Sequence, residues 1–574
     1  MLSGNRSDVS AEIMNSIAGV APKKTARCGY YLLAGLSLLL VLLIAADGVR
    51  KGADTVIPTY YRHTASLAIA ISEAAHGTSG MVGLMDVENA LDKFGYGINP
   101  NYARMSFLNT HPEEADAAIR AAADVAISDR TKTFGLMLNE TGVIDYYYVA
   151  FKLFGYHVRS IYALYIGVLA IVALCFIFAF RDCAVFIVPS IFYLLLLLVF
   201  QDAYPAKEFG FGPLTNSRML PYLSLYPVLF CLTLVGSSRR FRWVAALAAA
   251  VAGLIFAFVV NARTYAYWQV GPLVLIVMLI VLARFVPWRL PLRKRVARFS
   301  VYPVLIFACC AGALVANHHW RRDSIVYSTA TFAGHEYWLN YVVGTLPVFR
   351  WRIPELEQES GVTINGDDSY GGALVRIKIK ERGERLDDYL EGDWWNQTKR
   401  DELARQIAFD LWRDYPGLMI KNYLRDFKPI VENLLKDLAL LGLAIAVVAI
   451  GSSRRLLWLL GAGLLFAVGG VGGVIALLAA GLRYVLPAAR RLSLLVIPVS
   501  LLAICVVPTI IIMPYTDVHM VDPTVTITDP RMADVNNVVW LCLLICCCGL
   551  RFRLPRISSA WQRPMSLWRA QRSV

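Results

Sequence analysis

The sequence predicts an all-α polytopic membrane protein with about 11 to 12 transmembrane helices and two extracytoplasmic insertions of α or α+β structure. Three observations support this fold class. Hydrophobic residues make up 57% of the 574 residues, against roughly 45 to 50% in a soluble domain, and the mean hydropathy is +0.53. Apolar runs of about the 20 residues that a spanning helix needs recur along the chain. Basic clusters adjoin these runs on what would be one side of a membrane.

Ten apolar runs are candidate spans, and residues 456–482 hold either one long helix or two short helices divided at GGVGG (469–473). The runs occupy residues 29–48, 160–180, 183–200, 219–237, 243–260, 272–288, 299–316, 437–451, 492–513 and 537–550. The first run is expected to be an uncleaved anchor. Twelve spans are favoured over eleven, because the basic tail belongs on the cytoplasmic side together with the N-terminus.

The net charge of +14 is expected to set the topology and not to bind nucleic acid, because the basic residues gather beside the apolar runs. The clusters are Lys23, Lys24 and Arg27; Arg239, Arg240 and Arg242; Arg289, Arg293, Lys294, Arg295 and Arg298; Arg454 and Arg455; and the tail from Arg551 to Arg572. Anionic lipid of the inner leaflet is their expected counterpart. All 11 cysteines lie in or beside apolar runs, which predicts neither a disulfide framework nor a zinc site.

This topology divides the chain into seven segments, with the N-terminus in the cytoplasm and both large loops outside. They are a cytoplasmic N-terminal segment (1–28), a transmembrane anchor (29–48), a first extracytoplasmic loop domain (49–158), a transmembrane core (159–316), a second extracytoplasmic loop domain (317–436), a C-terminal transmembrane bundle (437–550) and a basic cytoplasmic tail (551–574).

Both loop domains carry signals of folded structure. In THPEEADAAIRAAADVAISD (110–129), Thr110 and Glu113 have the spacing of a capping box, and alanine-rich helical composition follows. TKRDELARQIAFDLWRDYPG (398–417) predicts a helix that stops before its proline. The residues that share its apolar face are Leu403, Ile407, Leu411 and Trp412. GGALVRIKIKERGERL (371–386) alternates apolar and basic residues, which predicts a strand.

The common catalytic motifs of soluble domains are missing from the sequence. It contains no P-loop, no dinucleotide-binding glycine fingerprint, no serine nucleophile elbow and no HExxH motif. Nucleotide-driven pumps and membrane metalloproteases are therefore excluded, whereas transporters are not. No internal repeat is evident, which disfavours a transporter built from duplicated halves.

The stretch NETGVIDYYYVAFKLFG (139–155) sets two carboxylates, Glu140 and Asp145, just before the apolar run that opens at Ser160. Its aromatic rings are typical of a membrane interface, and a helix along the outer surface is expected there. A carboxylate at the water boundary could act as a general base on an acceptor hydroxyl, because partial burial raises the pKa of such a group toward the working range. The alternative for Asp145 is an exposed acid at a helix start, where the helix dipole favours it.

This stretch, continued as DYYYVAFKLFGYHVRSIYALYIGVLA (145–170), resembles the first-loop signature of the GT-C superfamily, polytopic glycosyltransferases that use polyprenyl-phosphate sugars. NSRMLPYLSLYPVLF (216–230) supports the resemblance, and RYVLPA (483–488) is similar to a late arginine-tyrosine-proline segment of many such enzymes. GHEYWLNYVVGT (334–345) also resembles a set of uncharacterised bacterial membrane proteins whose outer loop carries a GH..W stretch.

The GT-C resemblance implies an inverting transfer in which Asp145 orients or deprotonates the acceptor, with Glu140 as the second candidate. Arginines at outer helix ends would hold the donor phosphate, because a guanidinium group forms two parallel hydrogen bonds to it. The candidates are Arg159, Arg218, Arg263 and Arg483. The topology places Arg218 and Arg263 on the same outer side as Asp145, whereas Arg483 lies inside if the chain has twelve spans. The alternative for each is an arginine that only reaches to the interface.

The second loop contains further candidates for acceptor binding or catalysis. His335 and Glu336 precede Trp338, and His335 could serve as an acid or a base. Asp367 and Asp368 lie in a glycine-rich stretch, where adjacent carboxylates could hold a divalent cation. The alternatives are a histidine bonded within the fold and an Asx-rich turn that leads into a strand. No recognised metal-ligand pattern is present, so the cofactor is unknown from sequence.

Three functions are compatible with these patterns. The leading hypothesis is a glycosyltransferase of the bacterial inner membrane that moves a sugar from a polyprenyl phosphate to a glycan or lipid acceptor at the outer face. The second is a transporter or flippase for a lipid-linked glycan, which needs polar residues within the spans, and the predicted spans are almost free of them. The third is a non-catalytic scaffold whose outer loops bind partners. An enzyme must bring Asp145, Arg218 and Arg263 around one cavity that opens to lipid.

Overall fold

The computed structural model describes residues 61–78, 83–93, 112–128, 137–138, 141–179, 243–262, 272–278, 301–322, 331–332, 337–391, 394–451, 460–465, 467–468, 473, 476–477 and 543. This part of the chain is mostly helical. The strands within it are four segments of two residues each, paired in two small sheets. The all-α class is therefore confirmed for the described residues.

One helical stretch within these ranges, Trp243–Asn261, is long and apolar enough to cross a bilayer. Two shorter stretches of the described chain, Val158–Val168 and Val301–Asn317, are apolar as well. Most of the other predicted runs lie outside the described residues, so a total of about 11 to 12 spans stays a prediction.

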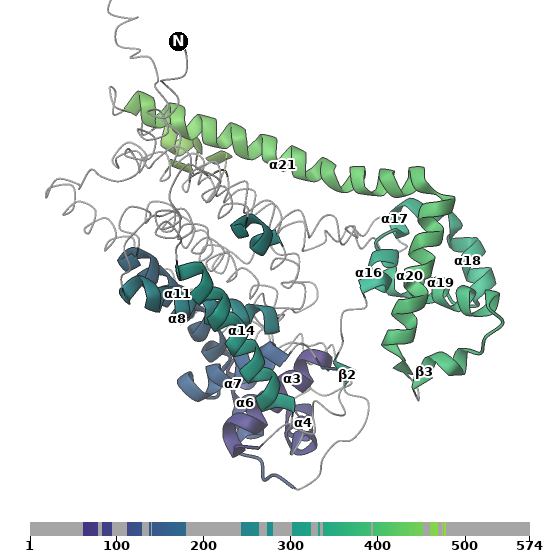
Figure 1. Ribbon diagram of the computed structural model, residues 1–574, viewed down its shortest axis with the longest axis horizontal. Helices are drawn as coiled ribbons and strands as arrows, with labels where there is room; N and C mark the ends of the chain where they lie inside the picture. The colour runs from purple at the N-terminus through teal and green to yellow at the C-terminus, as the bar shows by residue number, and fades with distance from the viewer. Residues whose placement is uncertain are drawn as a thin grey trace, which may run out of the picture.

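The first of two helical bodies is built around α3. Its helices from the first loop domain are α3 (Tyr61–His76), α4 (Leu84–Asp92), α6 (Pro112–Ala123) and α7 (Thr141–Phe154). Every residue of α3 from Leu67 to Ile71 is fully buried, and the other three helices pack around it (Figure 1). α6 opens with Glu113 and Glu114 in its first turn, so the helix expected from this stretch is confirmed, while Thr110 lies outside the described residues.

A sharp turn joins α7 to α8 (Val158–Ala179). The φ angle of Gly155 is 86°, in the left-handed region that glycine adopts most easily. The backbone N–H of Val158 donates to the Asp116 carboxylate on α6, with an N···O distance of 2.8 Å, and Nδ1 of His157 lies 3.5 Å from the same carboxylate. Asp116 thus satisfies a donor that the first turn of α8 cannot satisfy itself, and it fixes the point where the apolar helix begins.

α11 (Trp243–Ala262) and α14 (Val301–Arg322) pack against each other through small residues. A Cβ atom at Gly253 would lie 2.5 Å from the carbonyl oxygen of Ile306, so the two backbones approach as closely as glycine allows. The buried alanines of α11 are Ala245, Ala248, Ala249, Ala252 and Ala257. Interfaces of small residues are typical of helices packed in a bilayer. The outward faces carry exposed Leu247, Leu254 and Val315, as surfaces that contact a membrane do.

The second helical body has its own hydrophobic core and stands apart from the first (Figure 1). Its elements are α16 (Tyr337–Val343), α17 (Leu346–Phe349), η5 (Arg350–Arg352), α18 (Ile353–Ser360), α19 (Asp367–Glu381), η6 (Leu386–Tyr389), β3 (Leu390–Glu391), β4 (Trp394–Trp395) and α20 (Gln397–Asp414). β3 and β4 pair antiparallel. α20 confirms the helix expected over 398–415, because Leu403, Ile407 and Leu411 are buried in the core and Trp412 packs against it.

The strand expected over 371–386 is wrong, because α19 occupies most of this stretch. Its buried residues include Tyr370, Ala373 and Leu374, which are three and four positions apart as on a helix. The alternation arises from basic residues such as Lys378, whose partly buried side chain lies beside the core and pairs with Asp410 of α20. The sequence pattern therefore fits two periods, and packing against α20 selects the helical one.

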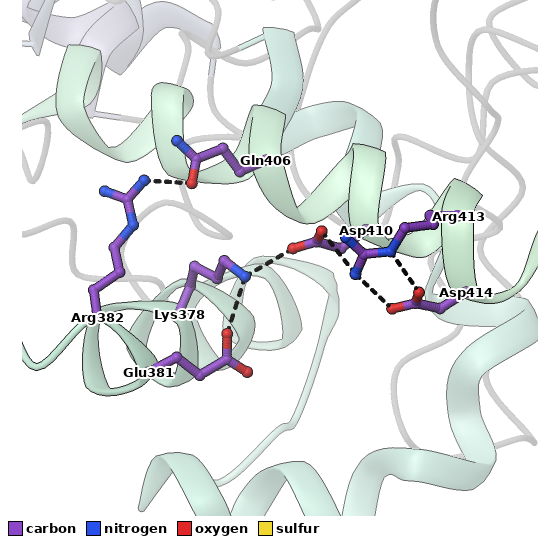
Figure 2. Close-up of polar contacts among 7 residues, drawn as sticks. All are labelled: Lys378, Glu381, Arg382, Gln406, Asp410, Arg413 and Asp414. Atoms are coloured by element: carbon purple, nitrogen blue, oxygen red, sulfur yellow. Dashed lines mark hydrogen bonds and ion pairs between the residues drawn. The ribbon is translucent and has the colours of Figure 1, made fainter.

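A polar network ties α19 to α20 (Figure 2). Nζ of Lys378 lies 2.7 Å from Oδ2 of Asp410 and 2.9 Å from Oε2 of Glu381. Nη2 of Arg413 lies 3.1 Å from Oδ1 of Asp410, so this aspartate is shared by two cations. Pairs this exposed contribute about 0 to 1 kcal/mol each. The network orients the two helices, and the role of Asp410 in it is structural.

α21 (Pro416–Gly451) is one continuous helix of 36 residues. It crosses the expected boundary between the second loop domain (317–436) and the C-terminal bundle (437–550). At 1.5 Å per residue it is roughly 54 Å long, and Figure 1 shows it reaching from the second body across the molecule.

A short ladder joins the two loop domains. β1 (Met137–Leu138) pairs in parallel with β2 (Thr331–Phe332), so that Met137 faces Thr331 and Leu138 faces Phe332. β1 belongs to the first loop domain and β2 to the second. Backbone hydrogen bonds need direct contact, so these parts of the two domains lie together.

Candidate functional site

Asp145 lies near the start of α7 with a half-buried side chain. Nδ2 of Asn317 on α14 donates to its Oδ2 at 3.3 Å. Asn317 is the last residue of the apolar stretch Val301–Asn317, and HHWRR follows it to the end of α14. The carboxylate therefore sits at the level where the apolar part of α14 ends.

α11 and α14 run in the same direction and approach α7 with their C-terminal ends. Gly253 of α11 lies against Ile306 of α14. Further along both helices, Phe258 contacts Tyr146 with ring centroids 5.7 Å apart, and Asn317 bonds the neighbouring Asp145. The expected topology sends the runs 243–260 and 299–316 outward, which is also one common direction.

Buried tyrosines hold α7 in place around the candidate acid. Tyr146 and Tyr147 are 1% and 0% exposed, and the Tyr146 hydroxyl donates to the carbonyl of Ile161 on α8. Burial raises the pKa of the Tyr146 phenol well above its ordinary value, so this hydroxyl stays a neutral donor. The expected surface belt of aromatic rings is wrong for Tyr146, Tyr147 and Phe151, which pack inside the protein. Their packing prevents α7 from rotating Asp145 away from α14.

The basic candidates lie mostly beyond the described part of the chain. Arg159 is exposed in the first turn of α8 and forms no ion pair among the described residues. Candidates outside the described residues are Glu140, Arg218, Arg263, Arg483, His335 and Glu336. In the sequence, Arg263 directly follows the last residue of α11, and Glu140 follows β1 by two residues. The cavity expected around Asp145, Arg218 and Arg263 therefore stays a prediction.

The described candidates of the second loop take part in packing. Trp338 on α16 contacts Phe409 with ring centroids 5.5 Å apart. Its backbone N–H and that of Leu339 donate to Oδ1 of Asp401 at 2.7 and 3.0 Å. Asp401 therefore caps α16 from α20, and Trp338 belongs to this joint between the helices.

Asp367 and Asp368 are the first two residues of α19. The turn expected at this point gives way to a helix start, where the helix dipole favours acidic residues. Within the described ranges, no group of three or more histidine, cysteine, aspartate or glutamate side chains could hold a metal ion.

Two residues that matter here were missed in the sequence. Asn317 had a signal, because it is the first polar residue after the apolar run that ends at residue 316. Asp401 had none, since an acid inside a predicted amphipathic helix is expected to face water. Both act on elements far away in the chain, which local patterns cannot reveal.

The described residues form a helical protein in which the half-buried carboxylate of Asp145 on α7 lies beside the end of the apolar stretch of α14. No protein family model matches the chain, and neither a curated protein nor a solved structure matches it. Function is therefore argued from the site and the sequence.

Proposed function

We propose that this chain is a membrane glycosyltransferase that moves a sugar from a polyprenyl-phosphate donor to a glycan or lipid acceptor on the outer face of the bacterial inner membrane. One observation carries the proposal. The Asp145 carboxylate is half-buried and bonded by Asn317 at the level where the apolar stretch of α14 ends. A lipid phosphate lies at this depth in a bilayer, where acyl chains meet headgroups. A base at this level can therefore meet an acceptor hydroxyl beside the donor.

The arrangement of the helices supports the same site. The C-terminal end of α11 and the end of the apolar stretch of α14 both lie beside α7, which supports a site at this end of the described residues. The β1–β2 ladder also brings parts of both loop domains together.

In the proposed reaction, Asp145 accepts the proton of an acceptor hydroxyl while the acceptor oxygen attacks the anomeric carbon of the sugar. The bond from that carbon to the phosphate oxygen breaks, the configuration inverts, and polyprenyl phosphate leaves with the bonding electron pair. The Asn317 amide stabilises the ionised carboxylate that a base must offer. Arginines at the outer ends would balance the charge of the leaving phosphate.

The test compares wild type with Asp145→Asn in detergent or nanodiscs, with release of polyprenyl phosphate from a panel of polyprenyl-phosphate sugars as the readout. A positioned general base contributes about 10²- to 10⁴-fold, so the variant should lose turnover by that factor. Asn keeps the size of the side chain and a carbonyl oxygen that can accept from Asn317.

Glu113→Gln is the matched control, because Glu113 is an exposed acid on α6 that changes charge in the same way away from the site. It should keep full turnover. Equal turnover by Asp145→Asn and wild type would move the base elsewhere, with Glu140 next. If the wild type turns over no donor of the panel, the glycosyltransferase proposal is contradicted, and the flippase and scaffold hypotheses remain.

A further inference from the structure

α21 carries a stripe of exposed apolar side chains along its first two thirds. Its members are Ile420, Leu424, Val431, Leu435 and Leu438, with exposed fractions of 52, 64, 49, 61 and 45%. They are spaced by four, seven, four and three residues, which places them on one face of a helix. Five large apolar side chains on one face, each about half exposed, form a surface that soluble proteins keep covered.

The neighbouring face of α21 is already occupied by the second body. Nδ2 of Asn422 donates to the carbonyl of Gly344 at 2.9 Å, and the Tyr423 hydroxyl donates to that of Tyr341 at 3.2 Å. Met419 is fully buried in the core. The start of the helix is therefore fixed, and the apolar stripe points away from the body to which the helix is attached.

Lysines border one side of the stripe. Lys421 and Lys428 are exposed, and each lies one helical turn before a stripe residue, Leu424 and Val431 respectively. Arg425 and Lys436 lie further from the stripe around the helix. Glu432 is the exposed acid among them. An apolar stripe bordered by lysines is the pattern of a helix that lies at a membrane surface, because the aliphatic stems follow the apolar groups while the ammonium ions reach the headgroups.

The same helix continues into an apolar segment. From Ala439 to Gly451, α21 contains no charged residue, so the stripe runs without a break into the predicted run 437–451.

We propose that residues 416–438 of α21 lie on the bilayer surface, with the apolar stripe among the acyl chains and Lys421 and Lys428 on anionic lipid headgroups. The second loop domain is then held against the membrane surface. This inference does not depend on chemistry at Asp145, so either proposal can fail without the other.

The experiment places a photo-reactive benzoylphenylalanine at Leu424 in the full-length protein, reconstituted in phosphatidylcholine vesicles with or without phosphatidylglycerol. Leu424 is exposed, so the substitution leaves the core unchanged. The matched control carries the same group at Glu432, on the other side of the lysines. After irradiation, lipid adducts are counted by mass spectrometry. Adducts should form at 424 and be several-fold fewer at 432.

Charge is tested in the 424-labelled protein with Lys421→Gln and Lys428→Gln. Each lysine near an anionic surface is worth roughly a fivefold change in binding, so each variant should lower the phosphatidylglycerol adducts by about that factor relative to phosphatidylcholine. Adducts that join two copies of the chain, or adducts within one copy, would overturn the proposal, because the stripe would then be a protein interface. Equal lipid adducts at 424 and 432 would overturn it as well.

Discussion

Two aspartates satisfy the starts of helices that are distant from them in sequence. Asp116 on α6 accepts from the N–H of Val158 at the start of α8, and Asp401 on α20 accepts from Trp338 and Leu339 at the start of α16. A cap of this kind contributes about 0.5 to 2 kcal/mol. Here each cap also fixes one helix against another, so its loss disturbs a joint and not only a helix end.

Asp401→Ala should lower the free energy of unfolding of the second body by about 1 to 3 kcal/mol, because two half-buried N–H groups lose their acceptor. Thermal unfolding in detergent measures the loss. Asp401→Asn keeps an acceptor oxygen and should lose less. Equal losses for both variants would show that the charge, and not the acceptor, holds the joint.

Burial raises the pKa of the Asp401 carboxyl above its ordinary value of 3.8, although its two backbone hydrogen bonds oppose the shift. The folded state therefore binds more protons than the unfolded state in the window that begins at about pH 4. In that window the free energy of unfolding should fall as the pH rises. Asp401→Asn cannot titrate and should remove this part of the decline, which unfolding curves over a pH series can measure. An unchanged pH profile in the variant would contradict the assignment.

At the scale of elements, the close packing of α11 on α14 depends on the missing side chain at Gly253. Gly253→Leu should cost about 1 to 3 kcal/mol or more, because its Cβ would lie 2.5 Å from the Ile306 carbonyl oxygen and the helices must separate. A lower thermal unfolding midpoint in detergent is the expected result. Gly312→Leu on α14 is the control, since a Cβ there meets nothing within 4 Å. If both variants unfold at the same midpoint, the close approach is not what stabilises the pair.

Elements with a single strong signal could be predicted from the sequence. α20 follows from a helical apolar face and a proline just past its end, and α6 follows from a capping-box spacing at its start and an alanine-rich composition. α19 could not, since alternation of apolar and basic residues over 371–386 satisfies a strand as well as a helix with long basic side chains. Its period was decided by contact with α20, which no local pattern contains.

At the scale of the whole molecule, the sequence predicts the helix that carries the candidate acid but not the distant residues that pack around it. The helix that carries Asp145 follows from the sequence. Its partner Asn317 lies 172 residues away, and the burial of Tyr146 depends on α8 and α11. Aromatic rings near an apolar run fit a membrane interface and a protein interior equally well, so packing between helices had to decide.

The β1–β2 ladder predicts that cysteines introduced at Met137 and Thr331 form a disulfide on oxidation, because these two residues face each other in the pair. The Cα atoms of directly paired residues lie within the range of roughly 4.4 to 6.8 Å that a disulfide needs. Disulfide-linked peptides are identified by mass spectrometry. Cysteines at Met137 and Phe332 are the control, since neighbouring residues of a strand point to opposite faces. A bond in the control alone would contradict the register.

The same ladder sets a parity condition on the chain between its strands. In a chain that crosses a bilayer, β1 and β2 can pair only if the number of crossings from Leu138 to Thr331 is even. The predicted runs between them number six, namely 160–180, 183–200, 219–237, 243–260, 272–288 and 299–316. A chain that skipped one crossing during insertion would leave the two strands in different compartments. The pairing of these four residues therefore reports whether the chain between them has been inserted with an even number of crossings.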